Sequence, residues 1–239
     1  AGSPSTNTTD TDGGDNFVDE NAPTAVQGGG VGAVLDVKAK TDNLRQTFLR
    51  FDLSGAGIPS TALVTNAKVR LWMSAVPSSS ASRTYDLYRV TANWSEGAIT
   101  WSNKPGVAGS STNSTSTGTT NDVYLRWTAT SDVQSFVNGT NTNYGWRVSD
   151  AAENTTATNL GEFSSTESPP ATNKTQWPVL LVDYGTPPVV TDDPDDQNIT
   201  YGDNASFTAT ASGTPTPTVQ WQESTGGGFS DISNGGIYS

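Results

Sequence analysis

Apolar and polar residues alternate in short runs along most of the first 185 positions. Alternation with a period of two places successive side chains on opposite faces of a β-strand. Three runs show it most clearly: Leu35, Val37 and Ala39; Leu49, Phe51 and Leu53; and Val69, Leu71 and Met73. Polar turns separate these runs from one another. The pattern therefore predicts an all-β protein.

Two segments depart from simple alternation. Residues 179–182 are apolar on both faces, which predicts a strand in the middle of a sheet. A helical spacing occurs once, with Thr130 or Ser131 as the expected N-cap and an apolar face made of Val133, Phe136 and Val137. The many short strands predict a jelly-roll-like two-sheet β-sandwich with a single helical turn.

Shifts in composition divide the chain into three parts. Residues 1–11 are rich in Ser, Thr and Asn without apolar periodicity, so a flexible leader is expected there. Residues 12–185 hold the predicted sandwich. Residues 186–239 begin with Thr-Pro-Pro and then carry shorter strand-like runs, one of which contains Trp221.

Two missing residue types exclude several kinds of chemistry. The chain has no cysteine and no histidine, which excludes disulfides, thiolate nucleophiles, Cys-based zinc sites and Ser-His-Asp catalysis. It has no glycine-rich phosphate loop and no recognisable pair of catalytic carboxylates. The sequence therefore predicts a protein that is not an enzyme.

Charge is unevenly distributed along the chain. The formal net charge is −12, yet all 12 Lys and Arg residues lie between Lys38 and Lys174. The acidic balance argues against nucleic acid as a partner, and no apolar run reaches the roughly 18 residues of a membrane span. The clustering of Lys and Arg in the middle of the sequence is compatible with a local cationic surface.

Four separated motifs carry a family resemblance. They are Phe17-Val18-Asp19, the stretch from Thr41 to Leu53, Asn-Trp-Ser-Glu-Gly-Ala-Ile-Thr-Trp-Ser-Asn-Lys-Pro at 93–105, and the stretch from Ser131 to Gly145. Over residues 12–185 the sequence resembles the DNRLRE domain, also classed as carbohydrate-binding module family 96. The resemblance implies the same sandwich fold and a non-catalytic module, extracellular or on the cell surface. Such a module binds or is displayed on polysaccharide, with an acidic one such as alginate suggested.

Residues 186–239 resemble the first half of a bacterial immunoglobulin-like domain, with Trp221 as its core tryptophan. A complete domain of this class has about 100 residues, so a partial immunoglobulin-like β-sandwich is expected. Either the natural chain is longer or another subunit completes the sandwich by strand addition. The second possibility gives an alternative function, a structural subunit of an extracellular fibre, sheath or adhesin built from copies of this chain.

One set of basic and aromatic side chains is a candidate ligand-binding surface. Arginine and lysine pair with uronate or sulfate groups, and tryptophan stacks on a sugar face. The candidates point away from the apolar rows or lie beside them: Lys38, Lys40, Arg45, Arg50, Lys68, Arg70 and Trp72. An ordinary solvated sheet surface with cross-strand ion pairs is the alternative for the same residues.

Several motif residues have expected structural roles. Trp94 and Trp101 are expected to be buried, and Glu96 to cap backbone N–H groups in the turn between them. Arg45 is expected first of all to form a structural ion pair with a buried carboxylate. The family often has Ser-Arg-Glu before its last strand, where this chain has Thr166 in place of the arginine.

Oxygen ligands suit calcium, and Asp15 and Asp19 are candidate ligands of a structural Ca²⁺ ion, with a solvated acidic segment as the alternative. No other cofactor is expected. Sequons for N-glycosylation matter only in a host that glycosylates exported proteins. They occur at Asn7, Asn93, Asn113, Asn138, Asn154, Asn173, Asn198 and Asn204.

Overall fold

The computed structural model describes residues 5–9, 14–27, 34–78, 80–167, 174–236 and 238. The chain divides into two compact units, with the boundary between Gly185 and Thr186. Within the described residues, the helices are too short or too polar to cross a membrane.

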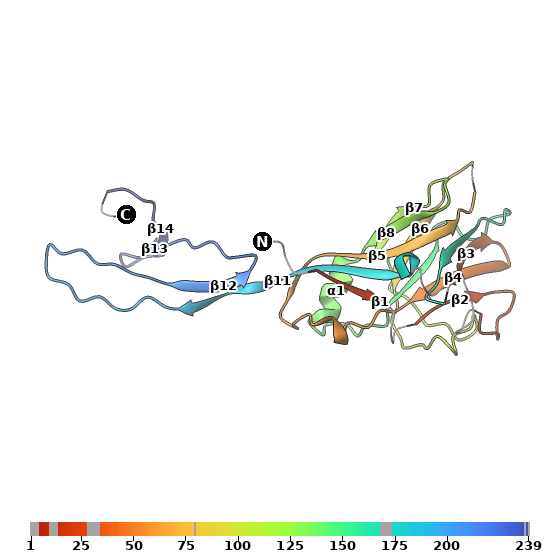
Figure 1. Ribbon diagram of the computed structural model, residues 1–239, viewed down its shortest axis with the longest axis horizontal. Helices are drawn as coiled ribbons and strands as arrows, with labels where there is room; N and C mark the ends of the chain where they lie inside the picture. Colours follow the sequence, from red (N-terminus) through yellow and green to blue (C-terminus); the bar gives the residue numbers. More distant parts are fainter. Residues whose placement is uncertain are drawn as a thin grey trace. The chain divides into compact units, whose positions relative to one another are not determined.

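The first unit is built from antiparallel strands (Figure 1). In sequence order they are β1 (Ser5–Thr9), β2 (Asp15–Asp19), β3 (Val34–Lys40), β4 (Asn43–Leu49), β5 (Leu63–Ala75), β6 (Thr84–Arg89), β7 (Asn113–Ser116), β8 (Val123–Thr128), β9 (Trp146–Asp150), β10 (Leu160–Ser164) and β11 (Val179–Asp192). Their hydrogen-bonded order is β1-β11-β5-β10-β3-β4-β9-β6-β7, with β2 beside β4 and β8 beside β5. The predicted all-β sandwich is confirmed.

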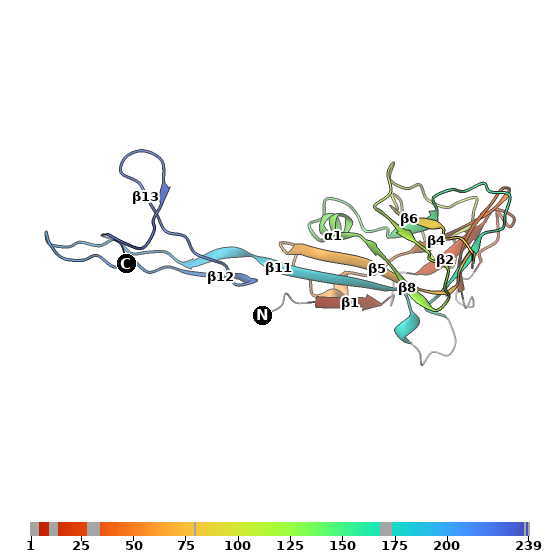
Figure 2. The same ribbon diagram turned by 90° about the horizontal axis from the view of Figure 1, so that it is seen from above.

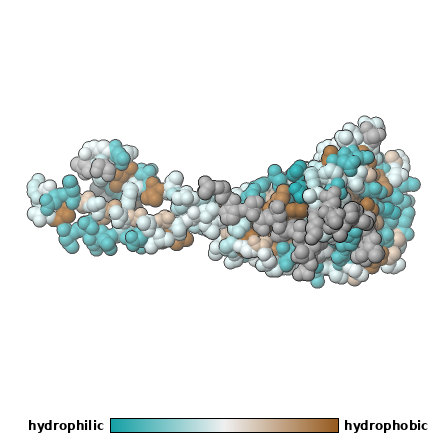
Figure 3. Space-filling view, in the orientation of Figure 1, coloured by the Kyte–Doolittle hydropathy of each residue, from teal (hydrophilic) through white to brown (hydrophobic). Residues whose placement is uncertain are grey.

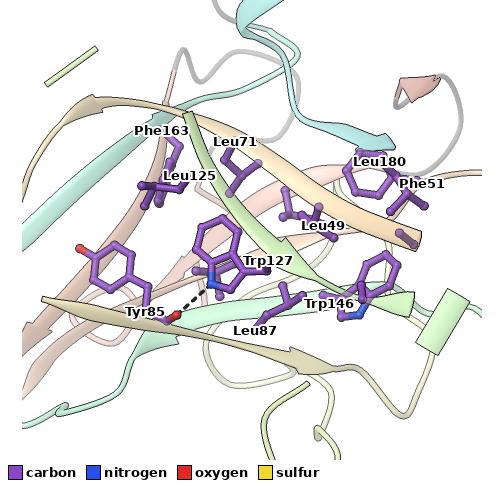
Figure 4. Close-up of a cluster of buried hydrophobic side chains, with 14 of the residues drawn as sticks. Leu49, Phe51, Leu71, Tyr85, Leu87, Leu125, Trp127, Trp146, Phe163 and Leu180 are labelled. Carbon is purple, nitrogen blue, oxygen red and sulfur yellow. Dashed lines mark hydrogen bonds between the residues drawn. The ribbon is translucent and has the colours of Figure 1, made fainter. Parts of the chain in front are cut away.

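The core lies between strands from the two ends of this order (Figure 4). Leu71 of β5 and Trp127 of β8 meet Tyr85 and Leu87 of β6 and Trp146 of β9 in one buried cluster. The indole Nε1 of Trp127 donates a 2.8 Å hydrogen bond to the backbone carbonyl of Tyr85. The predicted rows Leu35–Ala39 and Val69–Met73 lie on β3 and β5, as the period of two indicated. The row Leu49, Phe51 and Leu53 is not one strand: β4 ends at Leu49, and Phe51 enters the core from the irregular segment that follows.

The segment that was predicted as a leader contains a strand. β1 pairs with β11, Ser5 opposite Asp183 and Thr9 opposite Val179, and Figure 2 shows the two strands side by side. β11 also pairs with β5 along its other edge. Residues 179–182 are therefore in the interior of the sheet, as their double-sided apolar pattern predicted.

The predicted helix is α1 (Thr130–Val137), but its N-cap differs from the expectation. Ala129 occupies the cap position, and no side chain caps the helix. The hydroxyl of Thr130 instead accepts a 2.9 Å hydrogen bond from the N–H of Ala67 on β5. That bond ties the start of α1 to the sheet. Short 3-10 turns lie at Ser54–Ala56 and Lys174–Gln176.

The second unit holds few regular elements. The last part of β11 pairs with β12 (Thr210–Thr214), and β13 (Gln222–Glu223) pairs with β14 (Ser230–Asp231). Trp221 was predicted as a core residue, yet 41 % of it is exposed. A sandwich tryptophan is buried only beneath a second sheet, and the described strands of this unit do not form one over it. Apolar side chains accordingly appear at its surface in Figure 3.

Candidate functional site

One face of the first unit gathers cationic and aromatic side chains from two neighbouring strands. Arg70 and Trp72 of β5 lie directly opposite Arg126 and Tyr124 of β8. Lys68 precedes Arg70 by two residues and shares its face. Their sequence neighbours Val69, Leu71, Leu125 and Trp127 point into the core, so these five side chains face outward. We call Lys68, Arg70, Trp72, Tyr124 and Arg126 the β5–β8 face.

Tyr124 is the centre of this face. The ring of Trp72 meets it edge-on, with 4.7 Å between ring centroids. The guanidinium of Arg70 lies 4.5 Å from the centre of the Tyr124 ring, and that of Arg126 lies 5.5 Å from it. The Tyr124 hydroxyl donates a 2.6 Å hydrogen bond to the carbonyl of Thr175. These contacts hold two guanidinium groups around one aromatic platform.

The cations of the β5–β8 face have no acidic partner in the described part of the chain. The ion pairs there join Arg45 to Asp19 and Asp36, Arg83 to Asp150, and Arg89 to Asp132. Lys68, Arg70 and Arg126 take part in none of them, although the whole chain carries a net charge of −12. The positive charge of this face is therefore available to an anion from outside.

The structure brings together only some of the residues proposed from the sequence. Lys68, Arg70 and Trp72 lie on the β5–β8 face, whereas Lys40 lies at the β3–β4 turn, opposite Asn43. Arg50 follows β4; its guanidinium lies over the ring of Trp94 at 5.4 Å and donates to the side chain of Asn93. Lys40 and Arg50 lie away from the β5–β8 face because neither β3 nor β4 is a neighbour of β5. The sequence alone does not show this, since the order of strands depends on pairing between distant segments.

Arg45 forms the structural ion pair expected of it. Its Nε lies 2.8 Å from a carboxylate oxygen of Asp19, and its Nη1 donates to Asp36. Both carboxylates are buried. Burial raises the pKa of Asp36, and the Arg45 guanidinium opposes that rise. Lys38 is also buried, and burial lowers its pKa.

Tyr124 and Arg126 were not among the candidates. Their signal is the same alternation that identified β5, because Tyr124, Arg126 and Thr128 alternate with the apolar Val123, Leu125 and Trp127. The sequence could have placed them on the outer face of a strand. It could not have placed that strand next to β5.

The two motif tryptophans differ in burial. Trp94 is 6 % exposed and packs in a second core cluster with Phe48 and Ile99. Trp101 is only partly buried, and the ammonium group of Lys104 lies 3.1 Å from its ring centre. The expectation of a core residue therefore holds for Trp94 and fails for Trp101, because the open side of Trp101 is covered by a lysine and not by apolar neighbours.

Asn103 caps the turn between these tryptophans. Its side-chain oxygen accepts a 2.7 Å hydrogen bond from the N–H of Thr100, and its amide donates to the carbonyl of Ala98 at 2.9 Å. The Glu96 carboxylate lies beside those of Asp15 and Glu167, with one oxygen of each within 4.8 Å of the others.

This carboxylate group combines three segments that are far apart in the sequence. Asp15 is on β2 and is buried, while Glu96 and Glu167 are partly exposed. Such oxygen ligands could hold a hard cation such as Ca²⁺. Asp19, the other calcium candidate, is engaged elsewhere, since its two oxygens accept from Arg45 and from the N–H of Asn21.

The predicted sequons fall on positions of different accessibility. Asn173 and the side chain of Asn7 lie outside the described residues. Asn113 is half-buried and accepts a hydrogen bond from the N–H of Thr128. The exposed sequon positions are Asn93, Asn138, Asn154, Asn198 and Asn204.

Comparison with known proteins agrees with this architecture. Residues 188–231 match the immunoglobulin I-set domain. Endoglucanase C of Cellulomonas fimi is 51 % identical over 47 residues, which are 20 % of this chain and 4 % of that protein. The chain thus spans only a small part of this curated relative. Residues 7–181, more than half of the chain, match carbohydrate-binding module family 96. The chain therefore belongs to family 96 of the carbohydrate-binding modules.

Proposed function

We propose that this chain is a non-catalytic, extracellular module that binds an acidic polysaccharide through the β5–β8 face. One observation carries the proposal: Lys68, Arg70 and Arg126 surround the Trp72–Tyr124 pair without an acidic partner among the described residues. Membership of the carbohydrate-binding module family supports polysaccharide as the general ligand.

The chemistry of the face suits a chain of uronate or sulfated sugars. Guanidinium groups form charge-assisted, often bidentate hydrogen bonds with carboxylates and sulfates. The C–H groups on a sugar ring pack on an aromatic surface, which Trp72 and Tyr124 supply. Strand geometry spaces Lys68 and Arg70 by about 7 Å, so successive acidic sugars can each meet a cation.

Affinity electrophoresis tests the proposal. Gels containing alginate should retard the protein more than gels containing a neutral glucan, and added salt should weaken the retardation because it screens the charges. Arg126→Ala should reduce alginate affinity about tenfold. Lys40→Ala removes the same charge from an exposed position outside the face and is the matched control.

Two results would contradict this assignment. Equal retardation by alginate and neutral glucan would exclude an acidic ligand. Equal losses for Arg126→Ala and Lys40→Ala would show that net charge, and not this face, determines binding.

We also propose that Asp15, Glu96 and Glu167 hold a structural calcium ion. The three carboxyl groups offer oxygen ligands within 4.8 Å of one another, a donor set that suits a hard divalent cation. The ion would join β2, the 93–105 motif and the segment after β10, which supports a structural role.

A second candidate function is a subunit of an extracellular fibre, sheath or adhesin, in which a second copy of the chain completes the immunoglobulin-like unit. Its support is the exposure of apolar side chains there: Val189 is 58 % exposed, Val190 60 % and Phe229 74 %. Sedimentation over a range of concentrations tests it. Polymers that dissociate in Val190→Glu would support the fibre, and a monomer at all concentrations would exclude it.

A further inference from the structure

A pocket of about 450 Å³ opens beside the end of β4. Residues from three segments line it: Arg50, Phe51, Asp52, Leu53 and Ser54 after β4, Phe136 of α1, and Thr142 and Asn143 in the loop before β9. Arg50 was a candidate ligand residue in the sequence, and the structure places it here and not on the β5–β8 face. The volume falls in the range of small-ligand pockets, about 300–1,000 Å³.

Hydrogen bonds inside the chain fix the walls of this pocket. The amide of Asn143 donates to the carbonyl of Phe51 at 2.8 Å, and its oxygen accepts from the N–H of Gly145 at 3.0 Å. The ring of Phe136 lies 5.4 Å from that of Trp146, in the main core. A pocket whose walls are held in this way loses little conformational entropy when a ligand enters.

The charged groups of the pocket are also held in place. The carboxylate of Asp52 accepts two 2.8 Å hydrogen bonds from Ser54, one from its N–H and one from its hydroxyl. The bond from the N–H is the main cause that lowers the pKa of Asp52, so this carboxyl stays ionised at neutral pH. Arg50 donates to Asn93 and lies over Trp94.

The lining of the pocket combines charged, hydroxyl and apolar groups. A carboxylate accepts hydrogen bonds from two neighbouring hydroxyls, and a guanidinium donates to hydroxyl or ring oxygens. Ser54 and Thr142 add hydroxyl groups, while Phe136 and Leu53 offer apolar surface for C–H groups. The charges of Arg50 and Asp52 offset each other, so the pocket favours a neutral ligand, whereas the β5–β8 face favours an anion.

We propose that this pocket binds one neutral pyranose, as a chain end or a side group of a polysaccharide. The inference does not depend on the acidic polysaccharide proposed for the β5–β8 face. The module would then have two binding sites with different sugar preferences.

Titration of the full chain with methyl glycosides of glucose, mannose, galactose and xylose, followed by NMR, tests this proposal. At least one glycoside should bind saturably and shift the signals of Phe136 and Asn143. Thr142→Trp fills the pocket from an exposed position and should abolish binding, and Asp52→Asn should weaken it about tenfold or more. Ser110→Trp, at an exposed position that does not line the pocket, should have no effect.

The following outcomes would contradict sugar binding in this pocket. If none of the four glycosides binds, or if binding survives Thr142→Trp in a protein that still unfolds at the wild-type temperature, the assignment is wrong. Arg126→Ala should leave glycoside binding unchanged. A loss in that variant would place the neutral sugar on the β5–β8 face instead.

Discussion

The indole Nε1 of Trp94 donates a 2.8 Å hydrogen bond to the backbone carbonyl of Tyr144. Trp94 is the first tryptophan of the 93–105 motif, and Tyr144 lies in the segment that leads into β9. The Trp94 ring also packs edge-on against Phe48 of β4, with 5.8 Å between ring centroids. One side chain therefore joins three motifs that are separate in the sequence.

Trp94→Phe should destabilise the first unit. The substitution keeps an aromatic ring but leaves the carbonyl of Tyr144 without its donor, which costs about 1–3 kcal/mol. Urea unfolding measures the change in free energy. Trp101→Phe is the control and should cost less, because Trp101 is only partly buried. Equal costs for the two variants would contradict the assigned role of Trp94.

Gly145→Ala should be far more damaging than Gly139→Ala. Both glycines have positive φ, 76° and 75°, so an alanine is strained by about 1–2 kcal/mol at either position. A Cβ on Gly145 would lie 1.9 Å from the carbonyl oxygen of Leu49, whereas a Cβ on Gly139 meets nothing within 4 Å. The comparison isolates the clash, which we expect to add about 3 kcal/mol or more. Thermal unfolding of both variants measures it.

Arg45→Met should make stability depend on pH. The variant leaves Asp19 and Asp36 buried without their cation, at a cost of about 3 kcal/mol near neutral pH. The loss of the guanidinium lets burial raise the pKa of Asp36 further. A carboxyl whose pKa is raised on folding contributes stability that is present below its unfolded pKa, about 3.9, and is lost as the pH rises through the folded value.

The deficit of Arg45→Met relative to wild type should therefore shrink as the pH falls from 7 toward 4. Urea unfolding at several pH values measures it. Lys40→Met removes a cation from an exposed position and should show no such trend. A deficit that stays constant with pH would mean that the lost packing of Arg45, and not its charge, explains the effect.

Calcium should raise the thermal stability of the first unit. If Asp15, Glu96 and Glu167 bind the ion in the folded state only, millimolar Ca²⁺ raises the unfolding temperature by about 5 °C over EDTA-treated protein. Glu96→Gln should remove the increase, whereas Glu153→Gln, outside the carboxylate group, should keep it. Identical melting curves in calcium and EDTA would exclude the site.

The local pattern determined much of the first unit. Alternation identified β3 and β5, because burial of every second side chain is a property of a single strand. It was wrong for Leu49, Phe51 and Leu53, since β4 ends at Leu49. It also placed Lys68, Arg70 and Trp72 together on one side of β5. The ion pair of Arg45 followed from the motif in which it lies, although its partners Asp19 and Asp36 did not.

Only the tertiary structure determined which strands, and so which side chains, became neighbours. Because β8 pairs with β5, Tyr124 and Arg126 complete the cationic face. Lys38 is buried opposite Arg45. Arg50 lines the pocket beside the end of β4. The meeting of Asp15, Glu96 and Glu167 has the same origin. Each depends on pairing between segments far apart in the chain. Alternation along a strand predicts which face of the sheet a residue occupies, but it does not predict which other strand pairs with that strand.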